Sequence, residues 1–553
     1  TVDITMVVSY KSLYNRVFHK RMTFYYRLSV IIAIIFTFSI SLPFNSKLYS
    51  YPLKLMLLWL GYFIIQQARS FTTTTDSNIS PNIVFRSISL LNNKNTYILF
   101  TSFLINYSIT AIILFCQLNS LKYYIQTPTM TIKPFINDNF LYLCFTTLIS
   151  SIIFTLDFLF SEYNILRVKI GVFRQEPFDY LKNQPFIKIF ITSILKNLIY
   201  SFTIPLLYRL IFRDYFFHIF LKPLVFITGL NNQLPRSDIN YSTLFTISFY
   251  FWLTYLSLIL LNELFNAYAL IGCLNIDKQI TNYSKTPIST LLSGMKDFKN
   301  PLIRLTAFQE IAYLSTSNNF LDRQIFYRAD NWTLLLSDFF LILTNTAKSS
   351  KSDLSTLDGS SIIQFKDLIE KKLNINVNNN VSNPNSKKDI LSNDIKSQLS
   401  ILSTDILQIV NSFVYGNVET QSNKRIPNKE IVGFSIIALS EILINAKIED
   451  KSNSIINTLP DCLTILTKVY KGTSEFLNYQ IKVNKIDEDI LENTSIKIIN
   501  DLSLSYFFKI VINYNNLLND LLLPPEVFKL AKWCTDMALE QQKEQKLTTN
   551  ILS

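Results

Sequence analysis

The feature that most constrains this chain is a series of long apolar runs in its first half. A membrane-spanning helix needs about 20 mostly apolar residues, and six stretches approach or meet that requirement, at residues 26–43, 50–66, 97–117, 140–160, 187–208 and 244–265. The second is the weakest, because it is short, has Pro52 near its start and carries Lys54 near one end. The runs predict an all-α, polytopic membrane protein whose six-helix transmembrane domain occupies residues 26–265.

The charge of the chain is distributed unevenly between its two halves. Residues 1–265 contain 22 Lys and Arg and 10 Asp and Glu, a net charge of +12; subtraction from the totals of 52 and 40 leaves 30 of each sign in residues 266–553. Such asymmetry points to nucleic acid or to a membrane. Because the basic residues alternate with apolar runs instead of forming one stripe, we expect a membrane role and no direct nucleic-acid binding.

The basic residues also predict the orientation of the spans, since Lys and Arg favour cytosolic loops. The N-terminal flank and the loops on its side carry twelve of them, against seven on the other side. Residues 1–25 are therefore expected to be a basic cytosolic flank, and both termini are expected on the cytosolic or nucleoplasmic side. Lys20, Arg21 and Arg27 could in addition bind anionic lipid headgroups; the alternative is that these flanks only set the topology.

Residues 215–230 form a seventh apolar stretch, YFFHIFLKPLVFITGL. It is short and is interrupted by Lys222 and Pro223, which favours an interfacial or re-entrant helix over a span. Its membrane-facing side chains would be Phe216, Phe217, Phe220 and Leu221. If this stretch did span, the C-terminal half would be lumenal.

Among the ionisable residues inside the predicted spans are Lys196, Asp157 and Glu263. Such residues suggest a functional site by default, but only Lys196 is central, so we expect structural or snorkelling roles for all three. The alternative is a polytopic transporter or channel of an internal membrane with a cytosolic regulatory domain, and Lys196 is the residue that separates the two hypotheses.

Residues 266–553 are predicted to form a cytosolic or nucleoplasmic helical domain, with a disordered insert at about 347–388 that is rich in Ser and Asn. Residues 430–447 are apolar nearly all round, as expected of a central helix. Asn300-Pro301 marks a helix start. In that helix Leu305, Phe308 and neighbouring apolar residues share one face. Arg304, Gln309 and Glu310 lie elsewhere; we expect them to cap and pair within the fold, and the alternative is that they bind a partner.

Several kinds of chemistry have no support in this sequence. The five Cys are not arranged at metal-binding spacing, the two His are far apart, and no Gly-rich phosphate loop is present. We therefore predict no enzymatic activity, no metal site and no cofactor.

The helix that begins at Asn300-Pro301 also carries a resemblance. It carries a short sequence motif, called the box below, that follows six spans. The residues of the box are Pro301, Leu302, Arg304, Leu305, Ala307, Phe308, Gln309 and Glu310. Arg323, Tyr327 and Trp332 come shortly after it. This arrangement resembles the nuclear division cycle family of transmembrane nucleoporins.

The resemblance implies a structural role without catalysis. A member of that family would anchor the nuclear pore complex in the pore membrane of the nuclear envelope, aid pore assembly and, in fungi, help insert the spindle pole body. Its implied partners are the lipid bilayer, other pore-membrane nucleoporins and linker nucleoporins of the inner ring. Amphipathic helices could mediate these contacts by docking in grooves, and a homo-oligomer is a further option.

Overall fold

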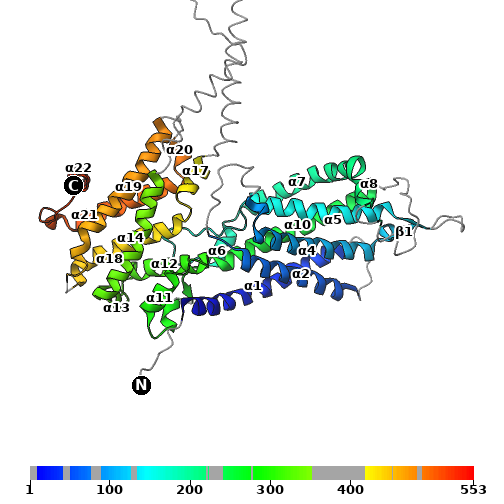
Figure 1. The fold of residues 1–553 in the computed structure, drawn as a ribbon, viewed down its shortest axis with the longest axis horizontal. Coiled ribbons are helices and arrows are strands. Elements are labelled where there is room, and N and C mark those ends of the chain that lie inside the picture. The colour runs from blue at the N-terminus through cyan, green and yellow to red at the C-terminus, as the bar shows by residue number, and fades with distance from the viewer. Residues whose placement is uncertain are drawn as a thin grey trace, which may run out of the picture.

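The structure of the protein is a computed structural model. It describes residues 9–41, 50–75, 89–125, 134–218, 222, 241–275, 278–351, 418–450, 453–482 and 488–552. These residues form an elongated, almost entirely helical molecule, with a membrane bundle at one end and a C-terminal helical unit at the other (Figure 1).

The membrane bundle contains long helices that lie roughly side by side along the molecule (Figure 1). They are α1 (Tyr10–Ser41), α2 (Tyr51–Thr72), α4 (Lys94–Gln117), α5 (Asp138–Phe160), α7 (Phe186–Leu207) and α10 (Tyr241–Ala269). Asn93 and Asn137 cap α4 and α5 by accepting hydrogen bonds from the backbone N–H two residues on. α2 packs between α1 and α4, and α10 contacts α1, α4, α5 and α7.

Shorter elements connect these helices. Two-stranded antiparallel sheets are formed by β1 (Tyr124–Ile125) with β2 (Phe135–Ile136) and by β3 (Leu274–Asn275) with β4 (Lys278–Gln279). Tyr124 pairs with Ile136, and Leu274 pairs with Gln279. The remaining elements are η2 (Asn119–Leu121), α6 (Pro177–Lys182), η3 (Tyr208–Phe212), α8 (Arg213–Phe216) and η5 (Ile280–Tyr283).

The C-terminal unit is built on one large apolar core. Its elements are α11 (Pro287–Met295), α12 (Pro301–Thr316), α13 (Phe320–Gln324), η6 (Ile325–Tyr327), α14 (Ala329–Lys351), α17 (Val418–Arg425), α18 (Lys429–Glu449), η8 (Ile456–Thr458), α19 (Leu459–Lys482), α20 (Glu488–Leu491), α21 (Ser495–Asn513), η9 (Asn515–Leu517) and α22 (Pro525–Leu552). α18 contacts α12, α14, α19 and α21, so it is the central helix that its apolar sequence predicts.

Six described helices are long and apolar enough to cross a membrane, but they are not the six that we predicted. Five agree, namely α1, α4, α5, α10 and α7 with its extension. The sixth is α18, of which 72% of the most apolar window is buried inside the C-terminal unit. α2 is absent from this set, although it lies in the membrane bundle between two candidate spans. An apolar sequence therefore identifies helices that are kept away from water. Tertiary contacts decide which of these helices face lipid and which are enclosed by protein.

The N-terminal flank is not a separate segment. From Tyr10 onward it forms the first turns of the 32-residue helix α1. Tyr10, Leu13, Tyr14 and Val17 are buried in the apolar core of the C-terminal unit. At 1.5 Å per residue α1 is about 48 Å long, whereas the bilayer interior is about 30 Å thick, so this helix is long enough to serve both units.

The stretch predicted as an interfacial helix begins inside the fifth span. α7, η3 and α8 are contiguous, and the candidate span runs from Phe186 to Phe216. Phe217 is fully buried and Phe216 nearly so, both within the apolar core of the membrane bundle. The prediction that these two residues face lipid is wrong, because ring contacts such as that between Phe216 and Phe145 hold this turn against α5. Phe220 and Leu221 lie outside the described residues.

The predicted insert starts too early. α14 continues to Lys351, and within it Ala347 and Ser350 are buried against neighbouring helices. The prediction that residues 347–351 are disordered is therefore wrong, because the polar Ser/Lys sequence there still places small side chains on the packed face. The rest of the insert, from residue 352 onward, lies outside the described residues.

Candidate functional site at the junction of the two helical units

The junction between the two units is organised around the carboxylate of Glu310, which is fully buried on α12. Tyr10 Oη donates a hydrogen bond to Glu310 Oε2 at 2.7 Å. The backbone N–H and the hydroxyl of Thr281 donate to Oε1 at 2.8 and 2.6 Å. One side chain of the predicted box thus joins α12, η5 and the first turn of the first membrane helix.

Burial raises the pKa of Glu310 to about 7, and the hydrogen bonds from Thr281 and Tyr10 offset only part of this effect. Glu310 is therefore a carboxyl group that titrates near neutral pH at a structural junction.

A second set of contacts joins the loops that follow α5 and α10. Gln309 Nε2 donates to the backbone oxygen of Val172 at 2.6 Å. Arg21 Nη2 donates to the backbone oxygens of Gly272 and Leu274, both at 2.9 Å. Because Arg21 is buried and bonded in this way, the prediction that it contacts lipid headgroups is wrong; the exposed Lys20 and Arg27 remain candidates for that role.

Gly272 is required by this arrangement. Its φ is +103°, and a Cβ atom there would lie 2.3 Å from the backbone oxygen of Phe173. Only glycine combines this backbone conformation with so close an approach of the two loops.

The other box residues belong mainly to the core. Leu305, Ala307 and Phe308 are buried, and Leu302 packs partly buried against the same core. Pro301 opens α12 as predicted, although Asn300 turns its amide to Asp297 and does not cap the helix with its side chain.

The polar residues of α12 do not form a solvated face. Arg304 lies over the rings of Phe298 and Phe308 and donates to the backbone oxygen of Met295 at 3.1 Å, while Gln309 and Glu310 are buried. α12 is therefore enclosed on nearly all sides, and its polar side chains hold the junction together from within.

The residues downstream of the box also have structural partners. Arg323 and Tyr327 both donate to the carboxylate of Glu449 at the end of α18, with Arg323 Nε 3.0 Å from Oε2. Burial alone would raise the pKa of Glu449, but the hydrogen bonds from Arg323 and Tyr327 outweigh it and lower that pKa. Trp332 is buried and donates its indole N–H to Thr458 Oγ1 at 3.2 Å.

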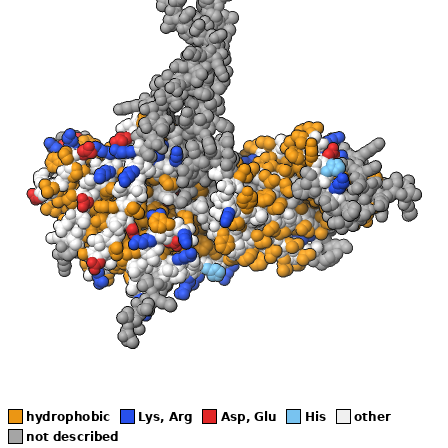
Figure 2. Space-filling view, viewed as in Figure 1, with side chains coloured by type: hydrophobic (Ala, Val, Ile, Leu, Met, Phe, Trp, Pro, Cys, Tyr) orange, Lys and Arg blue, Asp and Glu red, His pale blue; other side chains and the backbone are white. Residues whose placement is uncertain are grey.

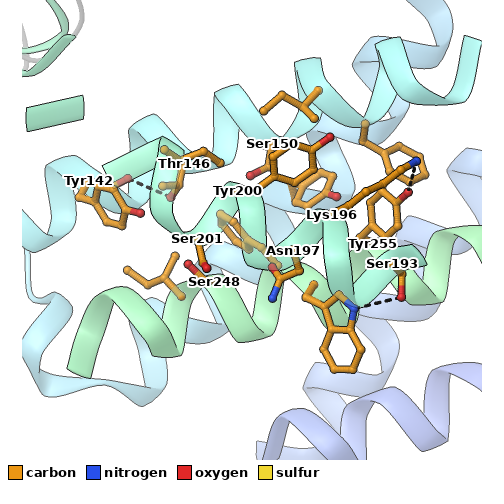
Figure 3. Close-up of a pocket in the computed structure, with 17 residues that line it drawn as sticks. Tyr142, Thr146, Ser150, Ser193, Lys196, Asn197, Tyr200, Ser201, Ser248 and Tyr255 are labelled. Atoms are coloured by element: carbon orange, nitrogen blue, oxygen red, sulfur yellow. Dashed lines mark hydrogen bonds between the residues drawn. The ribbon is translucent and has the colours of Figure 1, made fainter. Parts of the chain in front are cut away.

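Lys196, Asp157 and Glu263 have polar partners inside the membrane bundle, and Figure 3 shows Lys196 beside Tyr255. Lys196 Nζ donates to Asp157 Oδ1 and Oδ2 at 2.7 and 2.8 Å. Tyr255 Oη donates to Asp157 Oδ2 at 2.7 Å. Glu263 accepts a hydrogen bond from Tyr180 at 3.3 Å. Each of these ionisable groups therefore has a polar partner in the bundle.

Some functional contacts carry no signal in the sequence. Tyr10 lies 300 positions from Glu310, and Asp157 lies 39 positions from Lys196, so no local spacing links them. In the described part of the chain, no three His, Cys, Asp or Glu side chains gather as metal ligands would.

A comparison with protein-family models identifies the family to which the chain belongs. The model described as nucleoporin protein Ndc1-Nup matches residues 16–337 and 334–532, which is most of the sequence. The chain belongs to the Ndc1-Nup family of nucleoporins. The resemblance carried by the box in α12 is thereby confirmed.

Membership in the Ndc1-Nup family has direct consequences. The family is structural and non-enzymatic, and its members have a role at the pore membrane. Together with the candidate membrane-spanning helices, this makes the chain an all-α, polytopic membrane nucleoporin, which fits the nuclear envelope and contacts with other pore components.

Proposed function

We propose that the protein anchors the nuclear pore scaffold in the pore membrane, with both termini and the C-terminal unit on the cytosolic or nucleoplasmic side. The observation that carries this proposal is the continuity of α1, whose first turns lie in the core of the C-terminal unit while the rest runs through the membrane bundle. An anchor must transmit force from soluble partners to the bilayer, and a continuous helix with no loop between the two units is suited to that task.

The junction contacts support the same proposal. Glu310 and Gln309 of α12 tie α1 and the loop after α5 to the C-terminal unit, while Arg21 ties α1 to the loop after α10. In Figure 2, hydrophobic side chains dominate the exposed part of the membrane bundle, whereas charged side chains of both signs lie mostly over the C-terminal unit. The apolar belt suits the bilayer, and the charged surface suits contact with water and with soluble partners.

The proposed partners are other pore-membrane nucleoporins and linker nucleoporins of the inner ring. Amphipathic helices from these partners would dock on the C-terminal unit, and self-association in the membrane is a further mode. Aid in pore assembly and, in fungi, in spindle pole body insertion belongs to the same proposed role.

The test replaces the cellular protein with a fluorescently tagged copy of the full chain. We expect a punctate nuclear rim, together with retention of scaffold nucleoporins in the membrane fraction. A Tyr10→Ala variant, which loses the buried contact with Glu310, should release scaffold nucleoporins into the soluble fraction, whereas the exposed neighbour variant Lys11→Ala should retain them. A vacuolar or plasma-membrane pattern of the wild-type protein would refute the proposal.

A further inference from the structure

An open-sided crevice lies inside the membrane bundle between α5, α7 and α10 (Figure 3). Its empty space, with the open side included, is about 540 Å³. Its lining on α5 extends from Tyr142 to Phe154, about 18 Å of helix at 1.5 Å per residue. The crevice is thus a long site within the depth of the bilayer.

Some polar side chains that line the crevice make no side-chain hydrogen bond within the part of the chain that the structure describes. They are Ser150 on α5 and Asn197 and Tyr200 on α7. By contrast, Ser201 donates to the backbone oxygen of Leu198, and Ser193 donates to that of Phe190. Hydrocarbon offers no partner to an amide or a hydroxyl group, so these three groups suit a ligand that brings its own polar atom.

The charge of the crevice excludes an ionic headgroup as the preferred ligand. Lys196 is the cation of its lining, and its ammonium group is already bonded to both carboxylate oxygens of Asp157. With Tyr255 also donating to Asp157, the pair is neutral overall. A phosphate group would have to break this pair, whereas an uncharged hydroxyl group would not.

One wall of the crevice, α7, is the helix of the bundle that is most exposed to lipid. Only 11% of the most apolar window of the α7 span is buried inside the protein, the least of the six candidate spans. The outer face of α7 carries exposed apolar side chains at Ile191, Leu195, Leu198 and Phe202. A ligand would therefore enter from the bilayer.

The walls favour a flat and rigid ligand. Aromatic side chains form much of the lining of the crevice. They are Tyr107, Tyr142, Phe154, Tyr200, Phe251, Trp252 and Tyr255. A fused ring system packs against aromatic faces and loses little conformational freedom on binding, unlike a flexible acyl chain.

We propose that this crevice is a sterol-binding site of the membrane bundle. The sterol hydroxyl group bonds to Asn197, with Tyr200 and Ser150 nearby, and the ring system lies along the aromatic wall. A bound sterol would fix α7 against α5 and α10 and so couple the shape of the bundle to membrane composition.

The experiment uses the full chain in nanodiscs with a photoactivatable sterol, followed by mass spectrometry of the labelled peptides. We expect labelling on the lining residues of α5, α7 and α10, competed by unlabelled sterol. Asn197→Leu, which removes the amide, and Ser201→Phe, which fills the space, should each lower the competed labelling at least tenfold. Thr203→Val, on α7 but outside the crevice, should label as the wild type does.

Labelling that spreads over the whole lipid-facing surface, or equal competition by phosphatidylcholine, would overturn the proposal. Because Ser201→Phe could fail to fold, the wild-type protein provides a second measurement. Its thermal midpoint should rise as sterol is added to the nanodiscs, and an unchanged midpoint would count against a sterol site. If a transmembrane helix of a co-purifying protein were crosslinked in the crevice instead, the site would be a protein interface and the sterol proposal would fail.

Discussion

At the scale of single residues, the box in α12 is a set of packing and hydrogen-bonding positions. Phe308 and Leu305 fill the core of the C-terminal unit, while Gln309 and Glu310 reach the segments that lead into the membrane bundle. The same short sequence therefore stabilises one unit and connects it to the other.

Truncation in this core should be costly. We expect Phe308→Ala, or Leu305→Ala, to lower the free energy of unfolding by about 2–5 kcal/mol, because each leaves a cavity among buried side chains. The measurement is chemical denaturation of the purified protein in mild detergent. Phe298→Ala makes the same kind of change at a side chain that is 67% exposed and should cost far less; wild-type stability of the Phe308 variant would refute the burial.

Glu310 should make stability depend on pH. Its pKa rises from 4.5 to about 7 on folding, so between these values the folded protein binds a proton that the unfolded chain has lost. Stability should then fall as pH rises through this window, by about 3 kcal/mol in total, and level off above pH 7. Glu310→Gln should flatten the profile of thermal unfolding, while the exposed control Glu492→Gln should leave it unchanged.

Two glycines permit a comparison of backbone strain with steric overlap. Gly171 has a φ of +83° and open space around it, whereas Gly272 has a φ of +103° and lies against Phe173. We expect Gly171→Ala to cost about 1–2 kcal/mol from the left-handed backbone alone. Gly272→Ala should cost clearly more, because the loops after α5 and α10 must also separate. Equal losses in thermal stability would contradict the close approach.

At the scale of elements, the position of a helix in the molecule decides what its apolar face contacts. α18 and the membrane helices are similarly apolar, yet α18 is enclosed by protein and α7 is largely open to lipid. α7 is held to its neighbours in part by polar contacts, among them the pair of Lys196 with Asp157 and the bond from Trp252 to Ser193.

The Lys196–Asp157 pair can be tested as a structural contact. Lys196→Ala leaves an uncompensated carboxylate between α5 and α7 and should destabilise the bundle by about 3–5 kcal/mol. The double variant Lys196→Met with Asp157→Leu should recover most of this loss, since it replaces both charges with apolar side chains. Thermal unfolding in nanodiscs measures both effects. A double variant that folds normally but loses transport of a solute would favour the transporter hypothesis.

At the scale of the whole molecule, the described bundle is arranged with two distinct ends. The start of α1 and the loop after α5 meet the C-terminal unit, while β1 and β2 lie at the opposite end (Figure 1). The first turns of α1 and the C-terminal unit therefore lie at the same end of the bundle, and the side of the membrane that this end faces stays a prediction.

The proposed orientation can be tested with the glycosylation sequons of the chain. Asn331 and Asn493 begin such sequons in the C-terminal unit, and we expect both to stay unmodified because the transferase acts in the lumen. Thr129→Asn, which creates an acceptor sequence between β1 and β2 in the chain, should add a glycan that endoglycosidase removes. Glycans at Asn331 or Asn493 in the wild-type protein would reverse the orientation.

Local sequence pattern was enough to predict the helical class, most of the spans, the central position of α18, and the family through the box in α12. Tertiary structure alone decided the contacts between distant residues. Arg21 looks like a surface charge and Glu310 like a solvated one, yet both are buried because α1 enters the C-terminal core. Lys196 acquires its partner only when α7 packs beside α5. The physical reason is that periodicity reports which face of a helix is apolar, whereas the burial of a polar group depends on the donors and acceptors that other segments bring to it.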